Sequence, residues 1–263
     1  MKYIVKANGQ REPYSNKKVI NTCLRAGVSR KTAKKIADKI YRIIVDGDTT
    51  HRVYELIQVQ LEKTSKKASA KAGLREAIAN LGPRIFEMYA MKVLQVHGYQ
   101  CKWNKIVNGR IIDHQIDVIA KKDADVFFVE CKRHYNPHRY TGLGVALEVH
   151  ARLEDLKGGY KDGNNRYNFT RAWLFTNSKF SAHAIRYAMA KQIKLTGWSS
   201  GEFSIQKLIE SKKIYPVTML KIDMITKQNL LKRKIITVQD IIQTRIKLPN
   251  WNQIVKDARD LMR

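Results

Sequence analysis

Cysteine, long apolar runs and acidic residues are all scarce in this sequence, and each scarcity excludes a class of protein. The three cysteines, Cys23, Cys101 and Cys131, form no C-x-x-C pair, which excludes a disulfide framework and favours a reducing cytosol. No apolar run approaches the roughly 20 residues that span a bilayer. The first residues, with Lys2 and Lys6 around few apolar ones, do not resemble a signal peptide. We therefore expect a soluble, cytoplasmic protein with no membrane partner.

The shortage of negative charge has the clearest consequence. Lys and Arg number 50 against 23 Asp and Glu, so the net charge is +27. The excess is +8 over residues 1–63, +11 over 64–210 and +8 over 211–263, so it does not belong to a disordered basic tail. A folded basic surface attracts polyanions, with nucleic acid as the first candidate and an anionic membrane as the second. A ribosome-like structural role, or adaptation of a whole proteome, would give a similar charge.

The most informative stretch is Arg110–His134, which is predicted to form a strand, a charged turn and a second strand. Asp117 precedes one short apolar run, and a second apolar run ends in Glu130, Cys131 and Lys132. Because side chains alternate along a strand, Glu130 and Lys132 share one face and Cys131 takes the other. If the strands pair as a hairpin, Asp117 lies near Glu130 at the same end of the sheet.

Two carboxylates and an ammonium at the end of apolar strands fit phosphodiester hydrolysis. Carboxylates hold Mg²⁺, which lowers the pKa of a bound water. A lysine can orient or deprotonate that water, or offset charge on the phosphate. The plainer interpretation is a surface hairpin with a Glu130–Lys132 ion pair and an unrelated Asp117, since Asp followed by Glu-x-Lys is common by chance.

Residues from about Gly82 to Pro216 resemble the PD-(D/E)xK nucleases, specifically the Mrr-like restriction endonucleases. Four segments carry the resemblance: Gly82–Glu87, Ile116–Ile119, Val129–Lys132 and Phe175–Phe180. It implies an α/β fold with a restriction-endonuclease-like mixed sheet flanked by helices, and DNA as the substrate. It also implies Asp117 and Glu130 as ligands of Mg²⁺ or Mn²⁺, Glu87 as an assisting helix carboxylate in the metal site, and Lys132 as the catalytic lysine.

Two histidines near this trio are further candidates. His114 precedes Asp117, and His134 follows Lys132, so either could assist catalysis at the rim of the site or form structural hydrogen bonds. A zinc site of Cys131, His134 and His138 is disfavoured, because Cys131 faces away and no fourth ligand is evident.

Two segments after the trio are predicted from their patterns. Residues 143–156 have helical spacing, and Arg152 on that helix faces the phosphate or pairs with Glu148 one turn away. The Gly- and Asn-rich stretch Gly158–Asn168 is expected to be a mobile loop. His114, Gln115 and the segment 146–152 also resemble the subgroup in which the nuclease follows an ATP-cone.

The first sixty residues have a pattern of their own. Short strands are predicted on both sides of an Ala7–Gln10 turn, followed by helices that begin after Ser15, after Ser29 and at Thr50. The motif Val5-Lys6-x-Asn8-Gly9-x-x-Glu12-x-Tyr14-Ser15-x-x-Lys18-Val19 resembles the ATP-cone, a nucleotide-binding regulatory domain of ribonucleotide reductases.

The ATP-cone resemblance implies ATP or dATP as a regulatory ligand. Lys6 and Lys18 would bind its phosphates, Glu12 would assist at the sugar or phosphates, and Thr50 and Tyr54 would lie near the base or ribose. Association of copies of the chain, if it occurs, is expected through this domain. The plainer alternative is a small basic domain with solvated lysines.

Four regions are therefore expected: an α+β ATP-cone over 1–63, a partly helical connector over 64–81, a nuclease domain over 82–204 and a helical C-terminal module over 205–263. The expected function is nucleotide-regulated, metal-dependent DNA cleavage in defence or DNA processing. One alternative is a nucleotide-responsive DNA-binding regulator with an inactive nuclease centre. A structural RNA-binding protein is another.

Overall fold

A computed structural model gives the fold and describes residues 2–6, 9–198 and 203–263, with only the backbone of Lys66 and Lys67. The chain divides into two compact units. The first comprises Met1–Leu74, Met219–Lys221 and Asn250–Arg263, and the second comprises Arg75–Thr218 and Ile222–Pro249. The expected C-terminal module therefore contributes to both units. Over the described ranges, no helix has both the length and the apolar character needed to cross a bilayer.

The first unit contains a two-stranded hairpin and several helices. Strand β1 (Tyr3–Val5) pairs antiparallel with β2 (Arg11–Pro13). The helices are α1 (Asn16–Arg25), α2 (Arg30–Ile43), α3 (Thr50–Thr64), α4 (Lys66–Ala72) and α12 (Trp251–Met262). The hairpin and the three helices that follow it match the sequence prediction. Of the predicted turn, Ala7 and Asn8 lie outside the described residues.

The helices of the first unit start and pack as their sequences predict. The side chains of Ser15, Ser29 and Thr49 each accept a hydrogen bond from a backbone N–H three residues further on, which satisfies one unpaired donor of the first turn. Apolar residues recur every three or four positions, so each helix turns one face inward. Val19, Ile36, Ile40, Ile57 and Leu61 are among the residues of the resulting core.

The second unit is built on a five-stranded mixed sheet in the order β3-β4-β5-β7-β9. The strands are β3 (Gln100–Asn108), β4 (Asp113–Lys122), β5 (Asp125–Lys132), β7 (Arg171–Thr176) and β9 (Lys194–Thr196). The first three are antiparallel, and β7 and β9 add in parallel. Strands β6 (Tyr140–Thr141) and β8 (Lys179–Phe180) form a separate parallel pair.

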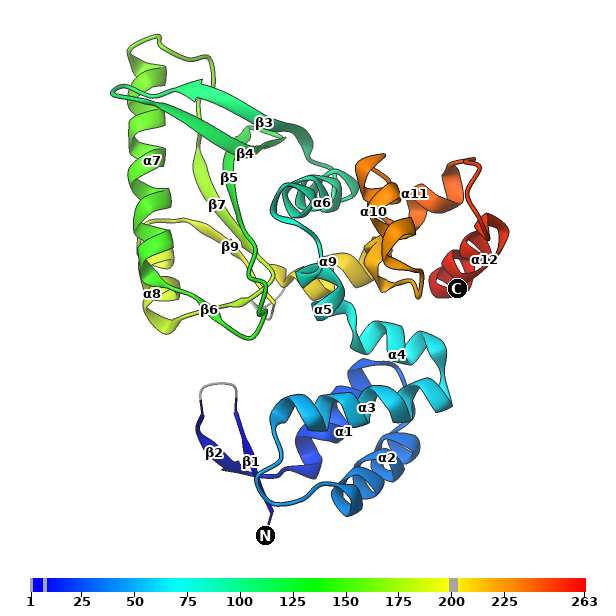
Figure 1. Ribbon diagram of the computed structural model, residues 1–263. Helices are drawn as coiled ribbons and strands as arrows, with labels where there is room; N and C mark the ends of the chain where they lie inside the picture. The colour runs from blue at the N-terminus through cyan, green and yellow to red at the C-terminus, as the bar shows by residue number, and fades with distance from the viewer. Residues whose placement is uncertain (1, 7–8, 199–202) are drawn as a thin grey trace. The chain divides into compact units, whose positions relative to one another are not determined.

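Helices flank this sheet, as the mixed α/β prediction requires. Helix α6 lies on one face, and α7 and α8 cover the other (Figure 1). Besides these three, α6 (Pro83–Val96), α7 (Leu143–Lys161) and α8 (Ala182–Ala190), the helices outside the first unit's bundle are α5 (Leu74–Ala79), α9 (Ile205–Lys212), α10 (Met224–Lys232) and α11 (Val238–Gln243). A short 3₁₀ helix lies at Val217–Met219. Phe128 and Leu174 pack with Leu153 of α7, while Phe175 meets Phe86 of α6. The central strands are therefore buried on both faces.

Helix α7 continues to Lys161, so the predicted loop start at Gly158 was wrong. Gly158 and Gly159 are buried, and a Cβ atom built on Gly159 would lie 2.5 Å from the backbone carbon of Gly109. The glycines are therefore required by the close approach of this helix to the turn between β3 and β4. Arg110 in that turn also pairs with Asp162 at the helix end, 2.7 Å from Nε to Oδ2.

Candidate active site

Strands β4 and β5 separate where Asp117 and Glu130 would face each other. Their last paired residues are Val118 and Val129. Beyond this pair, Asp117 Oδ2 accepts a hydrogen bond from the backbone N of Cys131 at 2.8 Å, so a side-chain carboxylate takes the place of a ladder acceptor. Asp117 and Glu130 therefore lie at the same end of the sheet, as the hairpin pairing predicts.

The sheet is distorted at this point on the neighbouring strand as well. Asn104 lies between the paired residues Trp103 and Lys105 of β3, across from Asp117, and has a φ of 50°. Asn is one of the few non-glycine residues that adopts this left-handed conformation readily. Its side-chain oxygen accepts a hydrogen bond from Gln115 Nε2 at 2.9 Å, which ties the two strands together beside the carboxylate.

Arg152 on α7 holds Glu130 in place. Its Nη1 lies 2.6 Å from Glu130 Oε2, and both side chains are 17% exposed. Its Nη2 donates to the backbone oxygen of Gln115, and its guanidinium lies 4.8 Å from the ring centroid of Phe128. The predicted pairing of Arg152 with Glu148 is replaced by this longer-range ion pair. The signal in the sequence is the position of Arg152, which directly precedes Leu153 and follows Val149 by three positions, a spacing that turns it toward the apolar face of the helix.

Burial and mutual repulsion raise the pKa values of both carboxyl groups. The pKa of Asp117 rises to about 6, mainly through burial and then through the charge of Glu87, although the Cys131 N–H and Arg152 oppose the rise. The pKa of Glu130 rises to about 7 through burial and the charge of Asp117, again opposed by Arg152. The site therefore concentrates negative charge that one arginine only partly offsets.

Glu87 and Lys132 lie near enough to influence this pair. Glu87 on α6 accepts a hydrogen bond from Trp103 Nε1 at 3.1 Å, and burial raises its pKa. Lys132, at the exposed end of β5, lowers the pKa of Asp117 by its positive charge. The carboxylates and lysine predicted from sequence are thus brought together. Arg152, which was expected to face the phosphate or to pair with Glu148, pairs with Glu130.

The two histidines serve hydrogen-bond networks beside the site. His114 is buried and its Nε2 lies 2.8 Å from Oδ2 of Asp155 on α7, which also accepts from the backbone of the β3–β4 turn. His134 Nε2 lies 3.0 Å from Thr141 Oγ1, and its backbone N donates to Asn177. Burial lowers the pKa of His134, as do the nearby positive charges. Within the described chain, no hydrogen bond joins either ring to Asp117 or Glu130.

The carboxylate pair fits a divalent ion that also takes ligands from water and substrate. Over residues 2–6, 9–198 and 203–263, no three His, Cys, Asp or Glu side chains are arranged to hold a metal by themselves. Oδ1 of Asp117 and Oε1 of Glu130 accept no hydrogen bond from that part of the chain. Two free carboxylate oxygens suit Mg²⁺, which keeps several waters and binds substrate phosphates.

Comparison with known proteins identifies the region that contains this site. Residues 78–200 match the restriction endonuclease family Mrr_cat. An uncharacterized protein of Archaeoglobus fulgidus is 37% identical over 173 residues, which make up 65% of this chain and 94% of that protein. Residues 78–200 therefore belong to this restriction endonuclease family. The matched range contains Glu87, Asp117, Glu130 and Lys132, and the restriction endonuclease domain indicates a nuclease that acts on DNA.

Two further similarities extend the comparison. The crystal structure of a protein of unknown function is similar to this chain with a TM-score of 0.59 and 32% identity, and the match covers 69% of this chain and 98% of that one. A second uncharacterized protein of Archaeoglobus fulgidus is 46% identical over 37 residues, or 14% of this chain and 79% of that protein.

Proposed function

We propose that this chain is a divalent-metal-dependent DNA endonuclease whose activity is controlled by ATP or dATP bound to the first unit. The observation that carries the hydrolytic part is the cluster of Asp117, Glu130 and Lys132 within the restriction endonuclease domain. The high charge of +27 supports a polyanionic substrate.

Each residue of the cluster has a role in this proposal. Asp117 and Glu130 would hold the ion, with Glu87 assisting from α6. Bound Mg²⁺ or Mn²⁺ would supply a water of lowered pKa and neutralise charge on the phosphate. Lys132, exposed at the strand end, orients or deprotonates that water. Arg152 offsets the charge of Glu130 in the free protein.

The nucleotide part is supported by a convergence of cations in the first unit. Lys6 and Lys18 both pair with Glu12, at Nζ–Oε distances of 3.0 and 2.9 Å. Hydrogen bonds from Lys18 and Lys6 lower the pKa of this carboxyl against the opposing effect of burial. A nucleotide phosphate can compete with Glu12 for these two ammonium groups, and the compact charge of lysine suits a phosphate.

The remaining nucleotide candidates lie on α3 in the same unit. Thr50 is the first residue of this helix, and β1 meets its start through a bridge between Val5 and Thr49. Tyr54 donates to the backbone oxygen of Ala72. A base placed at the start of α3 would therefore lie beside the end of β1, directly before Lys6.

A plasmid assay tests the proposal. Supercoiled DNA is incubated with the protein, with and without Mg²⁺ or Mn²⁺, and with and without ATP. We expect nicking that requires metal and falls at least about a hundredfold in Asp117→Ala, Glu130→Ala and Lys132→Ala. The control is Asp113→Ala, which removes an exposed carboxylate of the same strand.

Two outcomes would contradict it. Retained cleavage by all three variants would remove these residues from the site. If the unaltered protein binds DNA but shows no metal-dependent nicking, the protein is a DNA-binding regulator and not a nuclease.

A further inference from the structure

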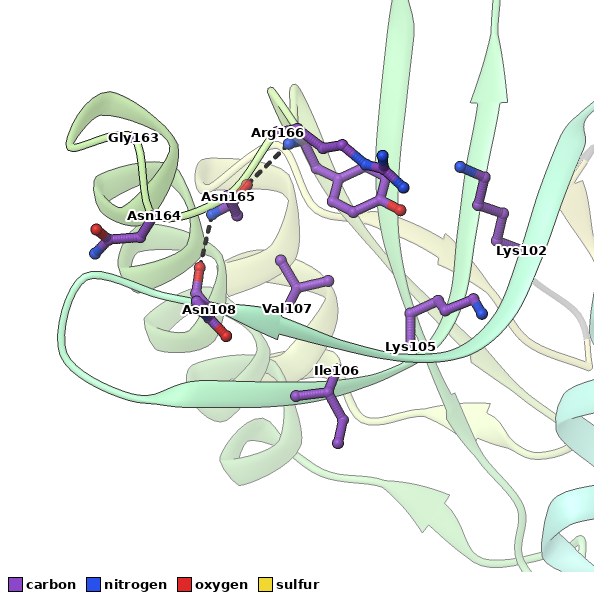
Figure 2. Close-up of a pocket in the computed structure, with 10 residues that line it drawn as sticks. Lys102, Lys105, Ile106, Val107, Asn108, Gly163, Asn164, Asn165 and Arg166 are labelled. Carbon is purple, nitrogen blue, oxygen red and sulfur yellow. Dashed lines mark hydrogen bonds between the residues drawn. The ribbon is translucent and has the colours of Figure 1, made fainter.

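A concave pocket of about 820 Å³ lies between β3 and the segment that follows α7. Figure 2 shows Lys102 and Lys105 on the strand and Arg166 on the segment across from them. Tyr167 completes the set of long polar side chains that line it. No carboxylate is found among the described residues of the lining, so this concave surface is cationic.

The sheet distortion beside Asp117 brings both lysines to this pocket. In a regular strand, residues three apart point to opposite faces. Here the left-handed Asn104 lies between Lys102 and Lys105, and both line the same pocket. Their partners on β4, Ile119 and Ile116, likewise belong to one core cluster. Lys105 therefore pairs with the residue that directly precedes Asp117, which places the pocket beside the candidate active site.

The pocket cations have no anionic partner in the described chain, unlike two arginines of this unit. Arg110 pairs with Asp162, and Arg171 pairs with Asp125. By contrast, Lys102 and Arg166 each lie 5.5 Å from the ring centroid of Tyr167. Tyr167 is half-buried, and a cation over such a ring is held by only about 0.5–2 kcal/mol, so a phosphate can compete for it.

Hydrogen bonds and stacking fix the walls around these cations. Asn165 Nδ2 donates to the backbone oxygen of Asn108 at 2.7 Å, which joins the segment to β3. Asn165 Oδ1 accepts from the backbone N of Tyr167 at 2.9 Å, and the Tyr167 ring stacks on Phe169 with centroids 5.7 Å apart. The ring is thus presented on a rigid support rather than on a free loop.

We infer that this pocket binds a single-stranded segment of the DNA substrate, with phosphates at Lys102, Lys105 and Arg166 and a base stacked on Tyr167. The inference rests on the proposed function, because the strand that is held belongs to the substrate of the nuclease. A pocket of this volume admits a ligand of small-molecule size and no double helix. Cationic grooves with aromatic rings are typical of single-strand binding. The preferred substrates are therefore DNAs with unpaired stretches, such as flaps, branches or frayed ends.

Fluorescence anisotropy in EDTA tests the inference, because no cleavage occurs without metal. A labelled 20-nucleotide single strand and the matching duplex are titrated at several salt concentrations. The test variant is Lys102→Gln/Lys105→Gln/Arg166→Gln. The charge-matched control is Lys191→Gln/Lys207→Gln/Lys212→Gln, which removes three exposed lysines outside the pocket.

We expect the pocket variant to weaken single-strand binding at least about tenfold beyond the control, with a much smaller change for the duplex. The slope of log K against log salt should fall by about 2, since each phosphate contact on a single strand contributes about 0.7. Tyr167→Ala should weaken binding at least about fivefold, and Tyr167→Phe, which keeps the ring, should bind normally.

Three results would overturn the inference: no loss beyond the control, an equal loss for single strand and duplex, or tighter binding of single-stranded RNA than of DNA. The thermal midpoint of each variant verifies that it is folded. A failure to cleave plasmid DNA would refute the proposed hydrolysis. The anisotropy measurement would still test single-strand binding at the pocket, because it does not depend on cleavage.

Discussion

Asp117 combines a structural and a chemical task in one carboxylate. Where β4 and β5 separate, the backbone N–H of Cys131 has no backbone partner on β4 and donates to the Asp117 side chain instead. Asp117 also faces Glu130 across the gap between the strands. Ionising it beside other carboxylates is unfavourable, because burial raises its pKa to about 6 from an ordinary value of 3.8. A buried ionised carboxylate of this kind lowers the unfolding free energy, and it supplies the negative charge that the candidate active site uses.

Replacing this carboxylate should therefore make the protein more stable at neutral pH. The folded state binds more protons than the unfolded state between pH 3.8 and about 6, so the unfavourable contribution of Asp117 grows over this range and persists above it. Asp117→Asn keeps an oxygen for the Cys131 N–H, and we expect it to raise the unfolding free energy at pH 8 by on the order of 1–2 kcal/mol.

Chemical denaturation in EDTA at pH 4 and pH 8 measures this effect. The gain should disappear near pH 4, and the exposed Asp113→Asn should give little change at either pH. A gain of equal size at both pH values would show that charge is not its cause.

Sequence reasoning at the residue scale succeeds where local geometry decides. The alternation of side chains along β5 is enough to place Glu130 and Lys132 together, and hairpin pairing is enough to add Asp117. The pairing of Arg152 with Glu130 could not be found in this way, because it joins a helix residue to a strand residue 22 positions away in sequence. His114 was a plausible catalyst in sequence but has Asp155 as its partner.

At the scale of elements, α7 depends on two glycines that normally indicate a loop. Gly159 approaches the backbone of Asn108 and Gly109 so closely that a Cβ atom would lie 2.5 to 2.7 Å from their atoms. The sequence analysis ended this helix too early for that reason. Helix propensity is a local property, whereas the requirement for glycine here comes from the turn that the helix packs against.

Two glycine substitutions in the same helix should therefore have opposite effects. Gly159→Ala should destabilise the protein by about 1–3 kcal/mol, because backbone atoms must move to accommodate the methyl group. Gly144→Ala, where no atom lies within 4 Å of the added Cβ, should stabilise it by about 0.5–1 kcal/mol. Urea denaturation gives both values, and destabilisation of similar size at both positions would contradict the packing argument.

At the scale of the whole molecule, the chain has two compact units that differ in their proposed ligands. The sequence indicated both the small N-terminal hairpin with its helices and the mixed sheet. It did not indicate that Asn250–Arg263 joins the first unit, because that grouping depends on contacts between the two ends of the chain. Short helices carry too little pattern to show which core they join.

Nucleotide binding in the first unit should be measurable by calorimetry. We expect ATP or dATP to bind the unaltered protein, and Lys6→Gln or Lys18→Gln to weaken binding by about tenfold through loss of a phosphate contact. Lys17→Gln, an exposed neighbour, is the matched control. Absence of heat for every nucleotide would remove this half of the proposal.

Any coupling between the two ligands must be reciprocal. If ATP changes the affinity for DNA by some factor, DNA must change the affinity for ATP by the same factor. Titrations of each ligand in the presence of the other, in EDTA, measure both factors.

The left-handed residue Asn104 in β3 has a consequence for how this protein can diverge from its relatives. It lies across from Asp117 and between the two pocket lysines, so one distortion of β3 affects both the candidate active site and the proposed single-strand pocket. A one-residue deletion in β3 would misdirect both at once, whereas point substitutions can alter either alone. Homologous enzymes that cut different DNA structures are thus expected to vary at positions 102, 105 and 166 while keeping the length of this strand.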